Sequence, residues 1–364
     1  MEVGIVGLPN VGKSTLLNAL SNASAAASNY PYCTIEPNVA VVEVKDSRLP
    51  EIGGIVKPEK VTHPMLRFVD IAGLPRGAST GEGLGNMFLS HVRNVDAIAH
   101  VLRCFEDTSV VHVEGEIDPL RDLEIVETEL FLSDVQILDR RMEKLKKTAR
   151  TGDQHAQKEL DFLSGVRGLL DQGRRFEPDD DIDPELAAVL REISLLSSKP
   201  VLLVANIGEE PSAEVTVKCL GIVEKAAEAR NTACIAVSAK IEAEIGELEP
   251  EEGTILLKEL HFDQGALDRF VRACYDLLEV VTFFMIKGAE TRGWTVKRGT
   301  GVREAAGKIH SDMRDKFIRA EVISFADFTA CGGMSPARDE GLVRTEGKHY
   351  IVEDGDIVLV RFGK

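Results

Sequence analysis

A run of residues near the N-terminus has the types and spacing of a phosphate-binding loop. Gly7-Leu8-Pro9-Asn10-Val11-Gly12-Lys13-Ser14-Thr15 matches the pattern G-x-x-x-x-G-K-[ST]. The glycines allow backbone N–H groups to approach phosphate oxygens closely, and the lysine can reach the β- and γ-phosphates as a point charge. The hydroxyl after the lysine is the usual ligand of a phosphate-bound Mg²⁺. We therefore expect Mg²⁺ to bind Ser14 and a nucleotide to contact Asn10, Val11, Gly12, Lys13, Ser14 and Thr15.

The flanking residues supply the strand and the helix that such a loop requires. Residues 3–6 are a short apolar run typical of a buried strand, and residues 14–20 have the pattern of the first turns of a helix. The start of a helix adds a partial positive charge where the phosphates bind. A Gly-containing turn with a solvated lysine is the alternative, and the strand–loop–helix context disfavours it.

Two later motifs are expected to complete the metal and phosphate site. Thr34 lies in a loop rich in Pro and aromatic residues, where a threonine can bind Mg²⁺ once the γ-phosphate orders the loop. Asp70 and Gly73 form D-x-x-G at the end of an apolar strand, which places a carboxylate beside the metal and an N–H donor near the γ-phosphate. The Gly-rich residues 76–85 then predict a mobile switch segment.

The residue after D-x-x-G is Leu74, where many GTPases have the glutamine that orients the attacking water. Leucine can neither donate nor accept a hydrogen bond, so another group must assist hydrolysis. His112 is one candidate, because it follows the carboxyl end of a predicted strand over residues 97–102. A lone histidine is more often structural. The carboxamide oxygen of Asn10 is a second candidate, because it could help to hold K⁺ near the phosphates.

The base-binding motif departs from the guanine pattern. A strand over residues 200–205 ends in Asn206-Ile207-Gly208-Glu209, whereas a GTPase normally has N-K-x-D. Ile207 replaces the lysine, and the longer Glu209 replaces the aspartate that accepts from guanine. Asn206 can hydrogen-bond adenine through N7 and the 6-amine, as Asn does generally. Ser238 begins S-A-K after another strand, where the chain usually backs the base.

The tract from about residue 119 to 198 predicts an antiparallel helical hairpin. Apolar residues step by three and four along each half, and Thr151-Gly152-Asp153 forms the turn. A basic cluster near the tip is either a solvated face or a contact for a nucleic-acid backbone. Its members are Arg140, Arg141, Lys144, Lys146, Lys147 and Arg150.

Composition limits the class of protein. The chain has 364 residues, 44% of them hydrophobic and 28% charged, which is ordinary for a globular protein of two or three domains. Its net charge of −17 disfavours nucleic acid as a partner, although basic residues slightly outnumber acidic ones after residue 280. Six scattered cysteines without C-x-x-C pairs argue against disulfides and zinc. With no leader segment and no long apolar run, we expect a cytoplasmic protein without a membrane contact.

The whole chain resembles the YchF subfamily of Obg-like ATPases. The resemblance rests on residues 7–15, 31–38, 70–74, 81–86 and 206–209. It implies an α/β P-loop NTPase domain at residues 1–118 and 199–279, a helical coiled-coil insertion at 119–198, and a small α+β ubiquitin-like domain of TGS type at 280–364. It also implies a Mg²⁺-dependent ATPase that binds GTP more weakly and associates with ribosomes through the hairpin tip and the TGS-like domain. His112 falls where the family has a histidine proposed to assist hydrolysis.

Other functions are compatible with the motifs. The chain could be a GTPase that prefers GTP, or a ribosome- or RNA-binding factor in which nucleotide only gates docking. Stimulation of turnover by ribosomes would distinguish a switch from such a factor. A small-molecule kinase also has a phosphate loop, but D-x-x-G and N-x-x-E after later strands count against it.

Overall fold

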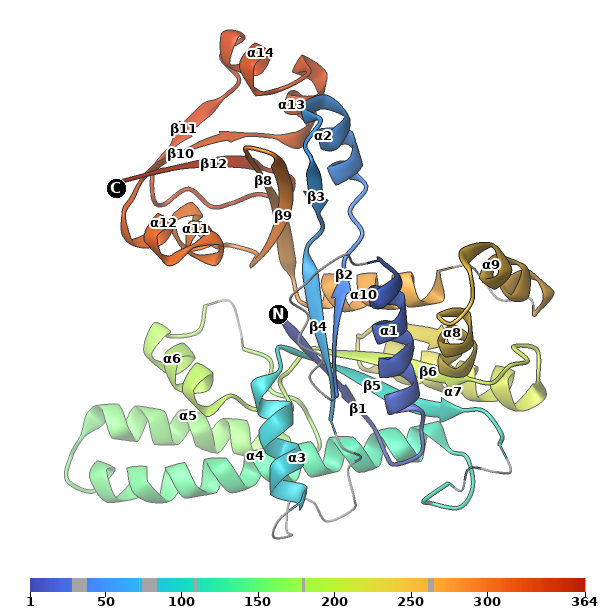
Figure 1. Ribbon diagram of the computed structural model, residues 1–364. Helices are drawn as coiled ribbons and strands as arrows, with labels where there is room; N and C mark the ends of the chain where they lie inside the picture. Colours follow the sequence, from blue (N-terminus) through green and yellow to red (C-terminus); the bar gives the residue numbers. More distant parts are fainter. Residues whose placement is uncertain are drawn as a thin grey trace. The chain divides into compact units, whose positions relative to one another are not determined.

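A computed structural model describes residues 1–27, 38–71, 73, 84–107, 110, 112–178, 181–260 and 265–363 of the chain (Figure 1). The chain forms two compact units. The first comprises Met1–Ala40 and Arg67–Phe270, and the second comprises Val41–Leu66 and Val271–Lys364. The sequence placed residues 41–66 in the nucleotide-binding domain, whereas in the structure they cluster with the C-terminal residues.

A six-stranded sheet organises the first unit. Its order is β2 (Val39–Glu43), β4 (Met65–Asp70), β1 (Glu2–Val6), β5 (Ala97–Cys104), β6 (Val201–Ile207) and β7 (Cys234–Val237). The pairs β4–β1, β1–β5, β5–β6 and β6–β7 are parallel, and β5 and β6 are buried along their whole length. Such continuous burial is typical of central parallel strands, which read as unbroken apolar runs. Parallel strands end at one edge of the sheet, so the loops after β1, β4, β5 and β6 converge there.

Helices surround this sheet in Figure 1. They are α1 (Lys13–Ala27), α3 (Leu84–Asn94), α7 (Glu214–Ala229), α8 (Ala239–Ile245), α9 (Pro250–Glu259) and α10 (Ala266–Leu277), the last of which continues into the second unit. Phe68 of β4 and Phe270 of α10 are fully buried, with ring centroids 5.3 Å apart. Burying large apolar side chains against the sheet is the main favourable contribution to folding.

The predicted helical hairpin is present. Helix α4 (Pro119–Ala149) and helix α5 (Gln154–Asp171) pack against each other, and α6 (Pro184–Ile193) covers part of their seam. The seam contains Leu138, Met142, Leu163, Val166 and Leu170, which follow the expected steps of three and four within each helix. Gly152 turns the chain with a φ of 88°, and the Asp153 carboxylate then caps α5 by accepting from two backbone N–H groups.

The second unit is a mixed α+β structure around its own sheet. The sheet has the order β11 (Arg344–Glu346), β10 (Phe317–Ile323), β12 (Ile357–Phe362), β8 (Val280–Lys287), β9 (Glu290–Lys297) and β3 (Lys60–Thr62). Its helices are α2 (Arg48–Val56), α11 (Val302–Ile309), α12 (Ser311–Asp315), α13 (Phe325–Cys331) and α14 (Met334–Asp339). Strand β3 pairs with β9, which brings residues 60–62 into the sheet of the C-terminal residues.

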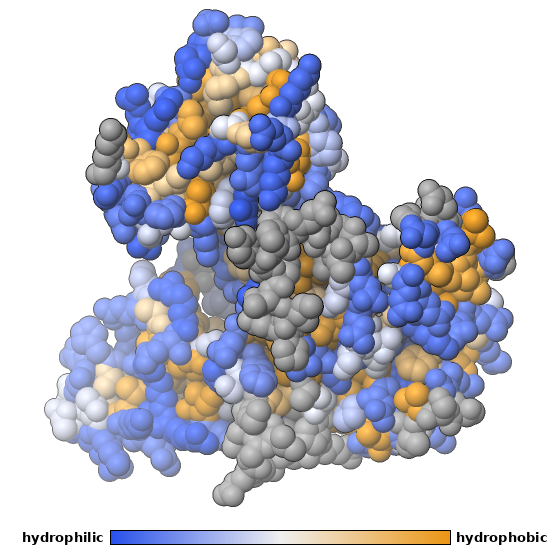
Figure 2. Space-filling view, in the orientation of Figure 1, coloured by the Kyte–Doolittle hydropathy of each residue, from blue (hydrophilic) through white to orange (hydrophobic). Residues whose placement is uncertain are grey.

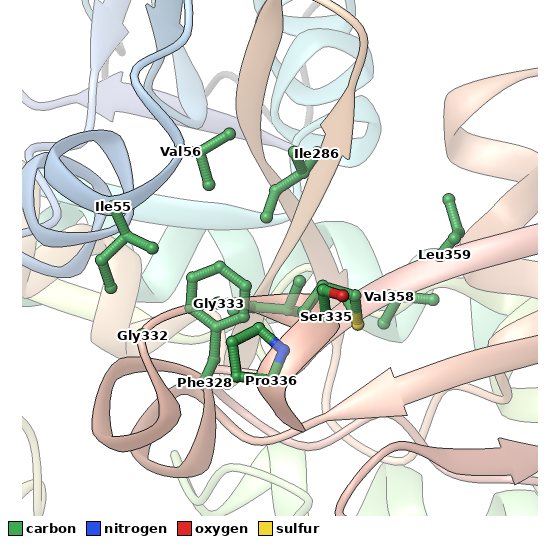
Figure 3. Close-up of a pocket in the computed structure, with 12 residues that line it drawn as sticks. Ile55, Val56, Ile286, Phe328, Gly332, Gly333, Ser335, Pro336, Val358 and Leu359 are labelled. Atoms are coloured by element: carbon green, nitrogen blue, oxygen red, sulfur yellow. The ribbon is translucent and has the colours of Figure 1, made fainter. Parts of the chain in front are cut away.

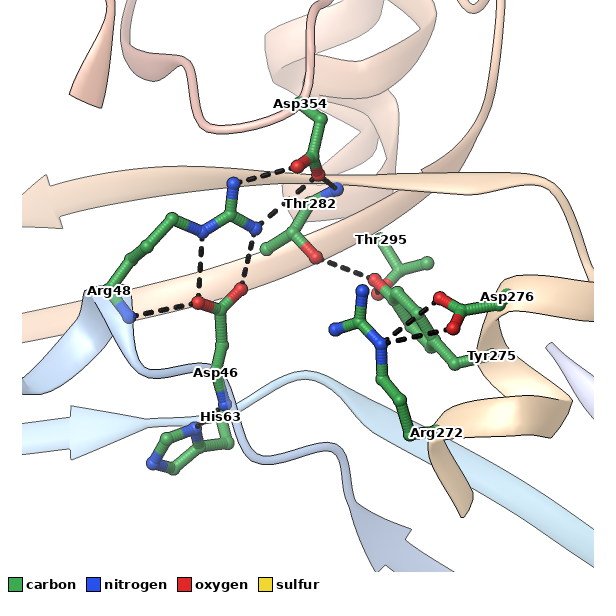
Figure 4. Close-up of polar contacts among 9 residues, drawn as sticks. All are labelled: Asp46, Arg48, His63, Arg272, Tyr275, Asp276, Thr282, Thr295 and Asp354. Atoms are coloured by element: carbon green, nitrogen blue, oxygen red, sulfur yellow. Dashed lines mark hydrogen bonds and ion pairs between the residues drawn. The ribbon is translucent and has the colours of Figure 1, made fainter. Parts of the chain in front are cut away.

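A polar network centred on Arg48 explains why residues 41–66 belong to this unit. The Arg48 guanidinium donates to Asp46 and to Asp354, each at 2.7 Å (Figure 4). Asp354 also accepts from the backbone N–H of Thr282 in β8 at 2.8 Å. Arg48 therefore joins the start of α2 to two distant parts of the C-terminal chain. Charge-assisted hydrogen bonds of this kind are stronger than neutral ones.

One face of the molecule displays both hydrophilic and hydrophobic side chains (Figure 2). In the view of Figure 2, blue side chains cover most of the visible surface of each unit, with smaller hydrophobic patches between them. Within the described part of the chain, we find no helix that combines the length and the apolar character needed to cross a membrane.

Candidate nucleotide-binding site

The loop between β1 and α1 has the conformation of a phosphate-binding loop. Gly7 has a φ of 155°, and a Cβ there would lie 2.5 Å from the carbonyl oxygen of Val101. Gly12 has a φ of 96°, and a Cβ there would lie 2.1 Å from Nδ2 of Asn206. Both positions therefore require glycine, for backbone conformation and for space. The loop ends where α1 begins, at Lys13.

Lys13 is buried in this loop. Its side chain folds back, and Nζ donates to the carbonyl oxygen of Leu8 at 2.8 Å. Burial lowers the pKa of Lys13 to about 8, and the nearby charge of Asp70 opposes this shift only in part. An anionic phosphate would restore the charged form, so the site is prepared for an anion.

Ser14 and Asp70 lie where a metal would be held. Ser14 Oγ donates to Asp70 Oδ2 at 2.5 Å, which brings together oxygens that are 56 residues apart in sequence. Asp70 Oδ1 is buried and has no hydrogen-bond partner among the described residues. A hydroxyl beside a carboxylate with an unused buried oxygen fits Mg²⁺, which binds one or two carboxylates together with phosphate oxygens. Thr34, the third predicted ligand, lies outside the described residues.

The described residues hold no group of three or more His, Cys, Asp or Glu side chains able to bind a metal ion.

Gly73 lies against the phosphate loop. A Cβ at Gly73 would meet the backbone nitrogen of Pro9 at 2.9 Å, closer than real Cβ contacts allow. The D-x-x-G motif is therefore next to the loop, as its predicted role requires. Leu74 and most of the Gly-rich residues 76–85 lie outside the described residues.

Asn206 connects the phosphate loop to the base-binding end of the site. Its Nδ2 donates to the Val11 carbonyl at 2.8 Å, and its Oδ1 accepts from the Ala239 N–H at 3.0 Å. The side chain is 4% exposed. The amide thus holds two loops together, and a base could use only its remaining N–H and lone pair. The Ser238 Oγ beside it is buried and has no partner in the described part of the chain.

The acidic residue of the base motif forms an ion pair that the sequence did not predict. Glu209 contacts the ammonium group of Lys240, the lysine of S-A-K. Both side chains are more than half exposed, so the pair contributes little to stability. The ion pair matters for base recognition, because the carboxylate that would accept hydrogen bonds from guanine already has a cationic partner.

Many of these groups line one cavity of about 970 Å³, whereas Val11, Asp70, Gly73 and Ser238 are not among its lining residues. Phe105, Val215 and Thr216 also line this cavity, although no sequence motif indicated that they would. Phe105 directly follows β5, so its position at the carboxyl edge of the sheet was a usable signal. The predicted residues that line the cavity are Asn10, Gly12, Lys13, Ser14, Thr15, Asn206, Ile207 and Glu209.

His112 does not line this cavity. It lines a neighbouring one, and its Nε2 lies 2.8 Å from Asp122 Oδ2. Both side chains are buried. The structure therefore does not bring His112 to the phosphate loop, because a carboxylate of α4 holds the imidazole elsewhere.

The second unit has a smaller cavity of different character. Its volume is about 350 Å³, and the side chains around it are mostly apolar, including Ile55, Ile286 and Phe328 (Figure 3). No charged side chain lines it. The chemistry suited to a nucleotide is therefore at the phosphate loop.

Comparison with known proteins gives the same picture. A family model described as 50S ribosome-binding GTPase matches residues 2–138, and the model YchF-GTPase_C, described as a protein of unknown function, matches residues 280–363. The chain is 43% identical to "Ribosome-binding ATPase YchF" of Bacillus subtilis, over 100% of this chain and 99% of that protein. It is 42% identical to the protein of the same name from Escherichia coli O157:H7, over 99% of each chain.

A solved structure agrees along the whole length. The Schizosaccharomyces pombe YchF GTPase is 34% identical and matches with a TM-score of 0.86, over 99% of this chain and 97% of that chain. This confirms the expected α/β P-loop fold with a helical insertion and a C-terminal domain. With full-length relatives well above 30% identity, the chain belongs to the YchF family.

Proposed function

We propose that this protein is a Mg²⁺-dependent ATPase that associates with the ribosome and switches between two nucleotide-dependent states. The observation that carries the proposal is the constellation of Lys13 and Ser14, which line the cavity at the glycine loop, with the Asp70 carboxylate hydrogen-bonded to Ser14. The B. subtilis and E. coli relatives, similar along the whole chain, bear the name ribosome-binding ATPase.

Each group has a distinct task in this proposal. The ammonium group of Lys13 leaves the Leu8 carbonyl and binds the β- and γ-phosphates. Ser14 and Asp70, with Thr34, would hold Mg²⁺, which would neutralise charge on the phosphate oxygens when bound. The Gly73 N–H donates to the γ-phosphate. Asn10 helps to hold K⁺ beside it.

Adenine is the preferred base. Ile207 gives the cavity an apolar side chain where a GTPase has lysine. The Glu209 carboxylate, which would have to accept hydrogen bonds from guanine, is paired with Lys240. Asn206 contributes its remaining hydrogen-bonding capacity to adenine, backed by Ser238. Loss of a bidentate guanine contact costs on the order of 1–3 kcal/mol, enough to reverse a preference.

Hydrolysis is slow without a partner. Leu74 cannot orient water, and His112, the candidate catalytic residue, is bound to Asp122. The exposed basic side chains of the hairpin tip and the C-terminal domain contact the ribosome. A cytoplasmic location remains a prediction of the sequence.

The test is release of phosphate from ATP with and without ribosomes. We expect slow turnover by the protein alone, faster turnover with ribosomes, and none above background for Lys13→Ala. Ribosomes that increase the bound fraction but leave turnover unchanged would favour a nucleotide-gated docking factor instead. Turnover that persists in Lys13→Ala would contradict the assignment of the site.

A further inference from the structure

His112 and Asp122 form a pair that is almost completely withdrawn from solvent. The imidazole Nε2 and the carboxylate Oδ2 are 2.8 Å apart, and the two side chains are 3% and 1% exposed. Asp122 lies in the first turn of α4, and its other oxygen accepts from the guanidinium of Arg121 at 3.0 Å. A buried carboxylate with partners on both oxygens is held firmly in place.

The second ring nitrogen of His112 determines the tautomer. The backbone N–H of Glu114 donates to Nδ1 at 3.1 Å, so Nδ1 is the unprotonated nitrogen. The proton is therefore on Nε2, which donates it to Asp122. With its only lone pair occupied by Glu114 and its only N–H by Asp122, the imidazole has no free position for a water molecule.

Two arginines fix the chain on either side of His112. Arg121 donates to the carbonyls of Glu114 and Glu116, and Arg103 donates to the carbonyls of Phe105, Asp107 and Val110. Arg103 is 2% exposed. These bonds satisfy main-chain carbonyls before and after His112 and fix the backbone there, whereas the ring itself is held by Asp122 and by the Glu114 N–H.

We propose that Asp122 is a positioning residue that holds His112 away from the nucleotide and thereby keeps intrinsic ATP hydrolysis slow. This rests on the proposed function, since it takes His112 as the group that assists hydrolysis. Only molecules in which His112 has left Asp122 can use the imidazole, so the rate is proportional to that fraction. The carboxylate of α4 lowers the fraction by giving His112 a buried, charge-assisted hydrogen bond.

The test is single-turnover ATP hydrolysis by four variants of the full chain. Asp122→Ala should hydrolyse ATP at least about threefold faster than wild type, with ATP affinity changed less than about twofold, because only the population of free His112 changes. His112→Ala should be slower than wild type, and Asp122→Ala/His112→Ala should be as slow as His112→Ala. Asp122→Asn keeps an acceptor for Nε2–H and should show a smaller gain.

The matched control is Asp118→Ala. Asp118 is a carboxylate at the same end of α4 that caps the helix by accepting from the Arg121 N–H, and it makes no hydrogen bond to His112. This variant loses helix stability without freeing the imidazole, so its turnover should equal that of wild type. ¹⁵N chemical shifts of the His112 ring give an independent readout, because wild type should show the Nε2–H tautomer.

A folded Asp122→Ala that binds ATP normally but turns over no faster would overturn the holding role, and so would a wild-type imidazole protonated on Nδ1. If Asp122→Ala does not fold, Asp122→Asn and the tautomer decide. If His112→Ala is as fast as wild type, both the role of His112 and its restraint are wrong. A chain that binds ATP yet never releases phosphate contradicts the proposed function itself.

Discussion

Lys13 is the buried cation of the phosphate loop, and in the proposed site nucleotide binding depends on it more than on any other single side chain of that loop. It is 6% exposed and its ammonium group contacts a backbone carbonyl of its own loop. Desolvation disfavours the charged form of a buried lysine, and this is why its pKa falls to about 8. Phosphate oxygens stabilise the charged form, so ATP binding must raise the pKa again.

This gives a prediction for pH dependence. Below pH 8 free Lys13 is already charged, and ATP affinity should be at its highest and nearly constant. Above pH 8 the free lysine loses its proton while the bound one keeps it, so affinity should fall by up to about tenfold per pH unit. Calorimetric titration between pH 7 and 9.5, in two buffers of different ionisation enthalpy, should show uptake of a proton on binding at the higher pH.

Two variants make this test specific. Lys13→Ala should lose high-affinity binding at every pH, because Lys13 is the only lysine or arginine of the phosphate loop. Lys240→Ala removes an exposed lysine from the same cavity and should keep the wild-type pH profile. An affinity of the wild type that is constant up to pH 9.5 would show that Lys13 does not titrate in this way.

The phosphate-loop residues could be predicted because their chemistry is contiguous in sequence. The pairs Glu209–Lys240 and His112–Asp122 could not, because their partners are 31 and 10 residues apart and no pattern connects them. The sequence predicted that Asn206 hydrogen-bonds the base. It did not predict that the Asn206 side chain joins two loops, because this contact depends on the close approach of the Asn206 amide to Gly12.

Among the helices, the hairpin was predictable from the spacing of its apolar residues, whereas shorter helices were not. The apolar seam of α4 and α5 follows from the spacing of three and four. Helices α6 and α2 could not be predicted in this way, because each is short and stabilised by tertiary packing.

The basic cluster near the hairpin tip has one member fewer available for a partner than the sequence indicated. Arg141 is committed to Glu159 and Glu192 within the hairpin and its adjoining helix, at 2.5 and 3.0 Å.

The remaining cluster gives a prediction for ribosome binding. Arg140, Lys144, Lys146, Lys147 and Arg150 are exposed, and replacing the first four with Gln should weaken co-sedimentation with ribosomes. Each lost phosphate contact should reduce the slope of log affinity against log salt by about one unit.

The control for this experiment is Arg141→Gln, which removes one positive charge of the hairpin that is already neutralised. It should leave the salt slope unchanged. If the fourfold variant also keeps the wild-type slope, the basic cluster is only a solvated face.

In the whole molecule, the order of the two structural units differs from the order of the chain. Residues 41–66 were expected in the nucleotide-binding domain, but they cluster with the C-terminal residues. These residues belong to the second unit, where Arg48 and strand β3 bind them to C-terminal residues. Nothing in residues 41–66 marks this change of unit, since hydrogen bonds to Asp354 and pairing with β9 are formed only in the fold. The two sheets, by contrast, follow from apolar runs that the sequence displays.

We propose that this chain prefers ATP, although its N-terminal part matches a family model described as a ribosome-binding GTPase. The most direct measurement is calorimetric titration of the full chain with Mg²⁺-ATP and with Mg²⁺-GTP under one set of conditions. The account predicts ATP binding several-fold tighter than GTP binding, a difference of about 1 kcal/mol or more. Tighter binding of GTP would contradict it.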